Sequence, residues 1–176
     1  MYIETCLGKS CHSVLKGCPC GFLTDAHHPC RCTSPKVQQY LARISGPLLD
    51  RIDLHIEVPA VPFQTLTQSQ DGEPSAAIKS RIVTARRRQQ RRFRTSGLFT
   101  NAHMRHRQLK ECCPMTEAAT DLFKTAMEEL QFSARSYDKI LKVARTISDL
   151  ADQDVLQTAH LAEAIQYRSL DRQLWV

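Results

Sequence analysis

Four closely spaced cysteines could bind a metal ion. They form two C-x-C pairs within the segment GCPCGFLTDAHHPCRC, first Cys18 and Cys20, then Cys30 and Cys32. Zinc favours four thiolates at the corners of a tetrahedron. The C-x-C spacing is tighter than the usual C-x-x-C, yet two such pairs that face each other can close a site. Two interpretations stay open: a structural zinc ion, or four reduced thiols in a loop.

Three further polar residues lie between the two cysteine pairs: Asp25, His27 and His28. Carboxylates and imidazoles also bind zinc, so these residues could replace a cysteine as ligand. We interpret them instead as turn and surface residues.

The bulk sequence indicates a cytoplasmic protein without a membrane partner. No stretch reaches the ~20 apolar residues that a membrane span requires. The N-terminal segment MYIETCLGKSCHS lacks the apolar region of a secretory signal. Cytosolic thiols stay reduced, so the eight cysteines are not expected to form a disulfide framework.

Positive charge is concentrated in one segment. Eleven Lys and Arg and no Asp or Glu occur from Lys79 to Lys110, whereas the rest of the chain is net acidic. The centre of this segment, RIVTARRRQQRRFR, is rich in residues that form helices well. Such a helix could neutralise nucleic-acid phosphates, and the candidate residues are Arg87, Arg88, Arg91 and Arg92. The alternative is a solvated helix whose arginines pair with acidic neighbours.

The first hundred residues predict few regular elements. A helix is expected over 34–44, with Ser34 as its N-cap and Pro35 in its first turn. The alternating segment LHIEV predicts a strand over 54–58. The basic helix is expected from about 75 to 95, with Ser75 as its N-cap. One face of it carries Ile78, Ile82, Ala85 and Gln89. The turn-rich segment TSGLFTN (95–101) is interpreted as a domain boundary.

The remaining sequence predicts a small helical bundle. A short helix is expected over about 102–112, and Thr116 and Ser133 are the expected caps of the next two helices. Apolar residues recur at helical spacing and indicate a bundle core instead of a cofactor site. They are Ala119, Leu122, Phe123, Ala126, Met127, Leu130, Tyr137, Ile140, Leu141, Ala144, Ile147, Leu161, Ala164 and Ile165.

Several long segments, in order, resemble one bacterial family. CPCGFLTD…CRC, YLARISGPLLDRIDLHIEVP, SARSYDKILKVARTISDL and HLAEAIQYRSLD are similar to the magnesium-chelatase-like AAA+ ATPases of the ComM/YifB competence type. The resemblance runs from Cys18 to about Arg172. It implies an α/β AAA+ core followed by an α-helical lid, a hexameric ring, and ATP with Mg²⁺ as cofactors. For the competence branch it also implies a motor on branched or single-stranded DNA.

The resemblance divides the chain into three parts. Residues 1–17 do not match the family, residues 18–100 correspond to the C-terminal part of the AAA+ core, and residues 101–176 correspond to the lid. The expected fold is therefore an α/β core remnant followed by a helical bundle, and mostly α overall.

Two arginines inherit roles from the resemblance. SGPLLDRID resembles the arginine-finger segment, with Arg51 as the finger that would contact the γ-phosphate of a neighbouring subunit. A guanidinium suits this role because it stays charged and offers a rigid fork of donors. The alternative is that Arg51 pairs with Asp50 or Asp53 as a structural bridge.

The second arginine stands at a predicted helix start. SARSYDKIL resembles the sensor-2 segment, with Arg135 in the first turn of a lid helix, where free amides and the helix dipole also favour phosphate. The alternative is an exposed surface arginine. Arg145, ten positions on, is interpreted as a salt-bridge or packing residue.

A phosphate-binding loop is missing from the sequence. The motif G-x-x-x-x-G-K-[ST] cradles nucleotide phosphates. The chain contains Gly8-Lys9-Ser10, but the position of the first motif glycine is Ile3. The family's Asn-Pro before CPCG is also replaced, by Lys16 and Gly17. The tripeptide is therefore interpreted as a chance match.

These observations predict the C-terminal part of a magnesium-chelatase-like ATPase, as a fragment or as half of a split protein. Alone it is not expected to hydrolyse ATP, because nothing in it can hold the phosphates and Mg²⁺. The alternative is a stand-alone, zinc-clipped and arginine-rich module that binds nucleic acid.

Overall fold

The structure is a computed structural model. It describes residues 2–5, 11–14, 16–23, 25, 28–56, 58, 61 and 72–168. The tripeptide Gly8-Lys9-Ser10, His27 and most of the expected loop over 59–74 lie outside these residues. The chain forms two compact units. Unit 1 contains residues 1–49 and 57–69, and unit 2 contains residues 50–56 and 70–176.

Unit 1 has little regular structure among its described residues. Strands β1 (Tyr2–Thr5) and β2 (Cys11–Val14) form an antiparallel hairpin, with Tyr2 opposite Val14. The cysteine segment follows, then helices α1 (Ser34–Leu41) and α2 (Gly46–Leu49). The helix predicted over 34–44 is confirmed, although it begins after Thr33 and ends at Leu41.

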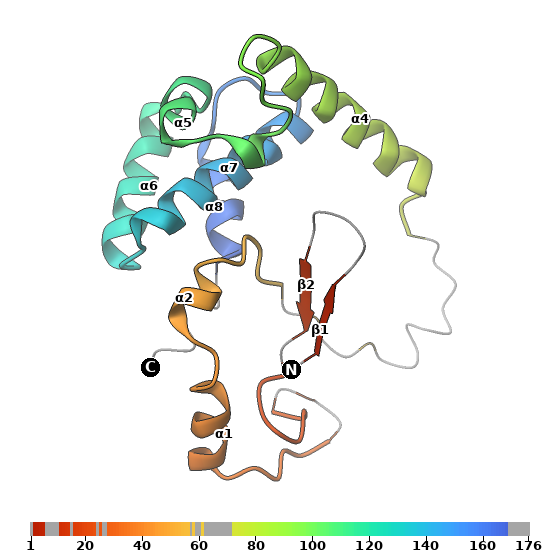
Figure 1. The fold of residues 1–176 in the computed structure, drawn as a ribbon, viewed down its shortest axis with the longest axis vertical. Helices are drawn as coiled ribbons and strands as arrows, with labels where there is room; N and C mark the ends of the chain where they lie inside the picture. The colour runs from red at the N-terminus through yellow and green to blue at the C-terminus, as the bar shows by residue number, and fades with distance from the viewer. Residues whose placement is uncertain are drawn as a thin grey trace. The chain divides into compact units, whose positions relative to one another are not determined.

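Unit 2 is a helical bundle (Figure 1). Its elements are α4 (Ser75–Arg92), the 3₁₀ helix η1 (Asn101–His103), α5 (His106–Cys112), α6 (Glu117–Glu129), α7 (Ala134–Leu150) and α8 (Thr158–Gln166). Helix α7 is the central element, because it contacts α4, η1, α5 and α8. The main core contains buried residues from α5, α6, α7 and α8, together with Phe93 directly after α4 and Met104 directly after η1.

Two of the predicted caps and the apolar stripes explain how this bundle forms, whereas the predicted cap Ser75 is the first residue of α4 and Pro74 is its N-cap. Thr116 accepts a hydrogen bond from the Ala119 amide at 3.3 Å, and Ser133 accepts one from the Ser136 amide at 3.1 Å. Each cap satisfies an amide that its helix leaves free. The predicted core residues are buried or half-buried, apart from Leu122, which is 37% exposed.

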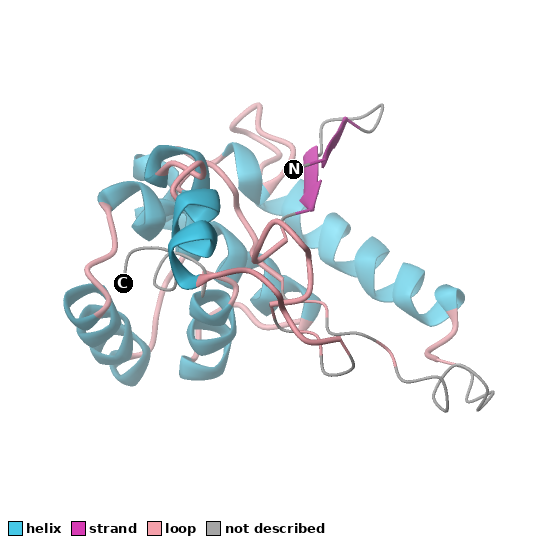
Figure 2. Cartoon of the chain, turned by 90° about the horizontal axis from the view of Figure 1, so that it is seen from below, coloured by secondary structure: helices cyan, strands magenta, loops and turns pink. Residues whose placement is uncertain are grey.

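The expected α/β core remnant is not observed. The segment LHIEV does not form a strand at its described residues, 54–56 and 58. The β1–β2 hairpin is the only sheet in the described part of the chain, and helices dominate it (Figure 2). A strand needs a partner for its backbone groups. Here the His55 amide donates instead to the Tyr167 carbonyl, at 2.7 Å.

Helix α4 belongs to unit 2, whereas the sequence placed a boundary near residue 100. Ala85, Gln89 and Phe93 are buried at its C-terminal half. These residues fasten the helix to the bundle across TSGLFTN, which is therefore a turn within unit 2. The first half of α4, by contrast, has only exposed residues.

Candidate functional sites

The four cysteines of unit 1 converge. The sulfur of Cys18 lies 3.3 Å from that of Cys20 and 3.7 Å from that of Cys30, and the Cys20 and Cys30 sulfurs are 3.6 Å apart. Together with Cys32, all four sulfurs lie within 4.8 Å of one another. Four thiolates at about 2.3 Å from one zinc ion would stand about 3.8 Å apart in a tetrahedron. The geometry of the cluster therefore suits a metal ion.

The thiols of the cluster differ in acidity. The backbone amide of Phe22 and the thiol of Cys18 lower the pKa of Cys20 to about 6. The Cys32 amide also favours the Cys30 thiolate, but desolvation and the neighbouring thiols outweigh it and raise the pKa of Cys30 to about 12. Each ionised thiol thus opposes ionisation of the next, and a divalent cation among the sulfurs would offset that repulsion.

The other polar residues of this loop have local partners. Asp25 accepts a hydrogen bond from the His28 backbone amide at 2.9 Å, and the His28 ring lies 3.4 Å from the same carboxylate. This is the turn geometry that the sequence indicated for these two residues.

Residues 50–55 lie along α7 and the end of α8, within unit 2. The Asp50 carboxylate accepts hydrogen bonds from the hydroxyls of Ser133 and Ser136 at 3.2–3.4 Å. Arg168 lies 3.6 Å from the same carboxylate and also donates to the Ile52 carbonyl. The first turn of α7 is therefore bound to an acidic group of its own chain.

Arg51 is held by its backbone alone. Lys139 donates to the Arg51 carbonyl at 2.5 Å and pairs with the Asp53 carboxylate at 2.6 Å. Asp50 and Asp53, the two acids that could have paired with Arg51, thus have other partners. The Arg51 residue is exposed, and no acidic side chain among the described residues pairs with its guanidinium.

Arg135 is also exposed and lies in the first turn of α7. Arg145 is different, because its side chain is 2% exposed and its guanidinium lies 3.1 Å from Asp149. The prediction that Arg145 is a salt-bridge residue is confirmed.

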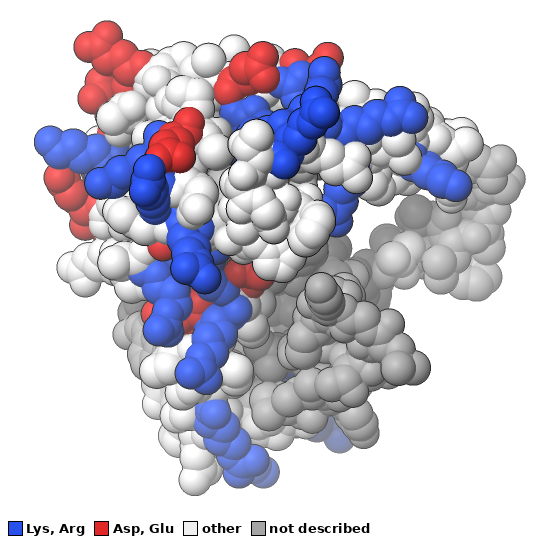
Figure 3. Space-filling model, turned by 45° about the horizontal axis from the view of Figure 1, so that its top comes forward, with Lys and Arg blue, Asp and Glu red and all other residues white. Residues whose placement is uncertain are grey.

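The arginines of α4 fall into two groups. Arg88 pairs with Asp152 and Asp154, and Arg92 forms a two-pronged ion pair with the buried Asp149. For Arg88 and Arg92, the structure shows pairing with acidic neighbours, which was the alternative to a nucleic-acid contact. Figure 3 shows the same mixture, with Asp and Glu side chains beside several of the Lys and Arg groups.

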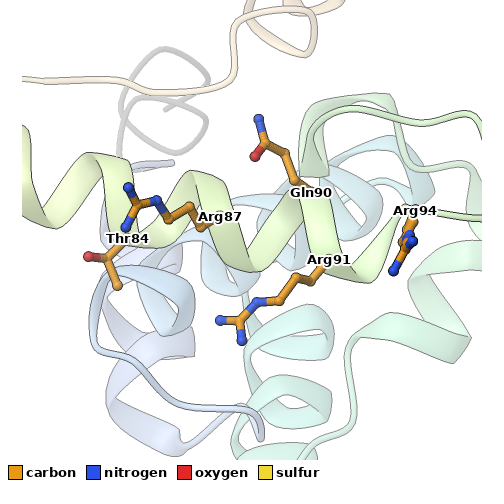
Figure 4. A pocket seen from close by; sticks show the side chains of 5 residues that line it. All are labelled: Thr84, Arg87, Gln90, Arg91 and Arg94. Atoms are coloured by element: carbon orange, nitrogen blue, oxygen red, sulfur yellow. The ribbon is translucent and has the colours of Figure 1, made fainter.

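Arg87 and Arg91 point elsewhere. With Thr84, Gln90 and Arg94 they line an open groove of about 550 Å³ (Figure 4). Residues at positions i and i+4 share one helix face, so Arg87 and Arg91 stand one turn apart on α4, and Arg94 lies two residues after the helix ends at Arg92. We call these three residues the arginine stripe. No acidic side chain of the described residues pairs with any of the three.

The sequence did not reveal the polar contacts that fix the segment around Arg51. The hydrogen bonds from Ser133 to Asp50, from Lys139 to Arg51 and from Arg168 to Ile52 join residues that lie 83, 88 and 116 positions apart. Asp149 was likewise not singled out. No local spacing marks these contacts, apart from the Arg145–Asp149 pair, which has i,i+4 spacing.

Two family models match the chain. The model described as "Magnesium chelatase, subunit ChlI" matches residues 12–66, and "Magnesium chelatase, subunit ChlI C-terminal" matches residues 72–168. The second match covers more than half of the chain. The protein therefore belongs to the magnesium chelatase ChlI family, as the sequence segments indicated.

Individual proteins with similar sequences indicate which part of the family the chain resembles. The chain is 37% identical to the uncharacterised protein YifB of Salmonella typhimurium, and 36% identical to the competence protein ComM of Haemophilus influenzae. Each match spans 157 residues, which are 89% of this chain and 30% of the relative. The chain thus corresponds to less than a third of these proteins. No helix among the described residues is long and apolar enough to cross a membrane.

Proposed function

We propose that this chain supplies two arginines to a nucleotide site of a magnesium-chelatase-like AAA+ ATPase. Arg51 would act as the arginine finger, in trans, and Arg135 as the sensor-2 residue. The phosphate loop and the residues that bind Mg²⁺ would come from the part of the ATPase that the chain does not match. ATP and Mg²⁺ are then cofactors of the completed assembly, which in the family is a ring.

The observation that carries this proposal is the guanidinium of Arg51, which has no acidic partner among the described residues. An arginine that pairs with a neighbouring acid cannot also bind a phosphate without losing that pair. Here Asp50 and Asp53 are engaged by other groups. An exposed, unpaired guanidinium beside an ordered backbone is suited to contact a γ-phosphate that accumulates charge during hydrolysis.

An ATPase assay tests the proposal in two steps. The chain alone should show no hydrolysis above background. Added to a full-length relative whose own finger arginine has been changed to alanine, it should restore hydrolysis, and the Arg51→Ala chain should not. Restoration that survives Arg51→Ala, or turnover by the repurified chain alone, would contradict the proposal.

A structural zinc ion at the cysteine cluster is part of the same proposal. The support is the convergence of four sulfurs from two C-x-C pairs in a loop with little other structure. Metal analysis after dialysis under reducing conditions should give about one zinc per chain. Cys30→Ser should lower that content, whereas Cys112→Ser, at a cysteine of unit 2, should not. Fresh protein without zinc would rule the metal out.

DNA is the proposed partner of the assembled ATPase. The family resemblance suggests it, and the arginine stripe on α4 is the feature of this chain that supports it. Arg87 and Arg91 are separated by about 6 Å along the helix axis, at about 1.5 Å per residue, and Arg94 follows directly after the helix. Guanidiniums at this spacing, without acidic partners among the described residues, suit a polyanion without reading its sequence. The same stripe also supports the stand-alone nucleic-acid module, which needs no ATP.

A further inference from the structure

We propose that Lys139, with Asp50 and Arg168, positions Arg51. These contacts make residues 50–56, which we call the finger segment, move as one body with the lid helix α7. This inference rests on the proposed function of Arg51. It adds residues that touch no nucleotide themselves but determine where the finger guanidinium stands.

The contacts cover nearly every residue around Arg51. The Arg51 carbonyl accepts a hydrogen bond from Lys139. The side chain of the preceding residue, Asp50, binds the first turn of α7, and the carbonyl of the following residue, Ile52, accepts a hydrogen bond from Arg168. Further along, the His55 amide donates to the Tyr167 carbonyl. The residues on both sides of Arg51 are thereby fixed to helix α7 and to the two residues that follow α8.

Burial strengthens the contacts that Lys139 and Arg168 make with residues 50–53. The Arg168 side chain is 1% exposed and that of Lys139 is 15% exposed, so both charges have left most of their hydration. A buried cation that loses its partners keeps the cost of desolvation, so the segment is unlike a loop that detaches freely. The Arg51 side chain, in contrast, is left in solvent.

The arrangement separates a fixed backbone from a free side chain. Ordering the backbone in advance removes most of the entropy that Arg51 would otherwise lose on reaching a phosphate. The same contacts reach Ser133, the N-cap of α7, two residues before Arg135. A movement of α7 must therefore carry both arginines together.

The test uses the full chain as the arginine donor in the ATPase assay described above. The variant is Lys139→Met, which removes the charge and the bond to the Arg51 carbonyl. The matched control is Lys142→Met, since Lys142 lies one turn along α7 and donates to the Ala102 carbonyl at 3.1 Å, away from the finger segment. Lys139→Arg is the conservative variant that should restore function.

We expect Lys139→Met to lower the maximal restored rate by about tenfold to a hundredfold, because a displacement of about 1 Å has this effect on catalysis. The chain concentration at half-maximal restoration should stay unchanged, which separates positioning from loss of assembly. A Lys139→Met chain as effective as wild type and Lys142→Met overturns this inference alone. A wild-type chain without Arg51-dependent restoration overturns the proposed function and this inference with it.

Hydrogen exchange of the isolated full chain gives an independent readout. In Lys139→Met the backbone amides of residues 51–55 should exchange faster, while those in the middle of α6 and α7 should keep their protection. Faster exchange throughout the bundle would mean that Lys139 acts on global stability, and that result would contradict a positioning role.

Discussion

Asp149 is the residue on which the charge balance of unit 2 depends. Its carboxylate is fully buried and lies within 4 Å of guanidinium nitrogens of Arg88, Arg92 and Arg145. Asn101 adds a hydrogen bond at 2.8 Å. Burial alone would raise the pKa of Asp149, but the hydrogen bonds from Arg92 and Asn101 and the arginine charges lower it below its usual value. One carboxylate therefore balances positive charge from two helices.

Asp149→Asn should destabilise the protein strongly. The substitution keeps the shape but leaves buried arginine charges without a counterion, which costs about 3–5 kcal/mol. Urea unfolding followed by circular dichroism measures the loss. The control is Asp152→Asn, which removes another partner of Arg88 at a carboxylate that is 72% exposed. That change should cost no more than about 1 kcal/mol, and equal losses for both variants would contradict this account.

Asp149 should also make the free energy of unfolding depend on pH. A carboxyl group whose pKa is lower in the folded state stabilises that state at neutral pH, and the stabilisation disappears as the pH falls through the folded pKa. The decline should begin near the unfolded pKa of about 3.9. The difference between the urea midpoints of wild type and Asp149→Asn, measured from neutral pH to pH 3, should therefore shrink once the pH falls below about 3.9. Parallel curves would mean that Asp149 contributes nothing through its charge.

Residue types could be read from the sequence more easily than residue partners. The four cysteines were predicted as a group because two C-x-C pairs lie close in the chain, and a short loop brings them together. The role of Arg51 rested on resemblance, since its local sequence suited a bridge to Asp50 or Asp53 equally well. Only tertiary contacts show that Lys139, Ser133 and Ser136 take those acids.

At the scale of elements, α4 has two unlike halves and two unlike faces. Its C-terminal half is anchored by Ala85 and Gln89, and its N-terminal half extends from the bundle with Ile82 48% exposed. Around the anchored half, Arg88 and Arg92 face acids of unit 2, and the arginine stripe faces away. Eight residues of sequence thus contain both structural cations and candidates for phosphate binding.

Reversing the stripe should reduce nucleic-acid binding without unfolding the bundle. The variant is Arg87→Glu with Arg91→Glu, measured by fluorescence anisotropy on a single-stranded oligonucleotide over about 50–200 mM salt. Fewer phosphate contacts should lower both the affinity and the slope of log affinity against log salt. The control, Arg105→Glu with Lys110→Glu, changes the net charge equally at exposed positions off α4. Equal losses in both variants would point to net charge and not to the stripe.

Element prediction succeeded where local pattern decides and failed where a partner decides. Thr116 and Ser133 were predicted as caps because a cap is read within four residues. The segment over 54–58 alternates as a strand does, but no strand of the described residues lies beside it, so the expected strand is wrong. Helical periodicity likewise could not show which face of α4 meets Asp149, because Asp149 lies 57 positions after Arg92 in the sequence.

At the scale of the molecule, the compact units and the family models divide the chain differently. The C-terminal family model begins at residue 72, whereas unit 2 also contains residues 50–56. The added residues supply two partners of Arg168, the Asp50 carboxylate and the Ile52 carbonyl, and Ser136 of α7 is another. Arg168 is among the most deeply buried side chains in the described residues. Residues 50–56 are therefore part of the fold of unit 2, although they precede its helices in sequence.

A chain of residues 72–168 should consequently be less stable than one of residues 50–168. The shorter chain lacks the Asp50 carboxylate and the Ile52 carbonyl, although Arg168 keeps its contact with Ser136. Breaking a buried ion pair by removing one partner costs about 3–5 kcal/mol. For a domain of this size that loss lowers Tm by about 10 °C or more. Thermal unfolding followed by circular dichroism compares the two. The control is a 50–168 chain with residues 50–56 in scrambled order, which keeps the length and composition but not the contacts. It should melt with the shorter chain, because the stabilisation comes from Asp50 and Ile52 at their own positions. If all three chains melt together, the finger segment does not belong to the folded unit, and its coupling to α7 fails with it.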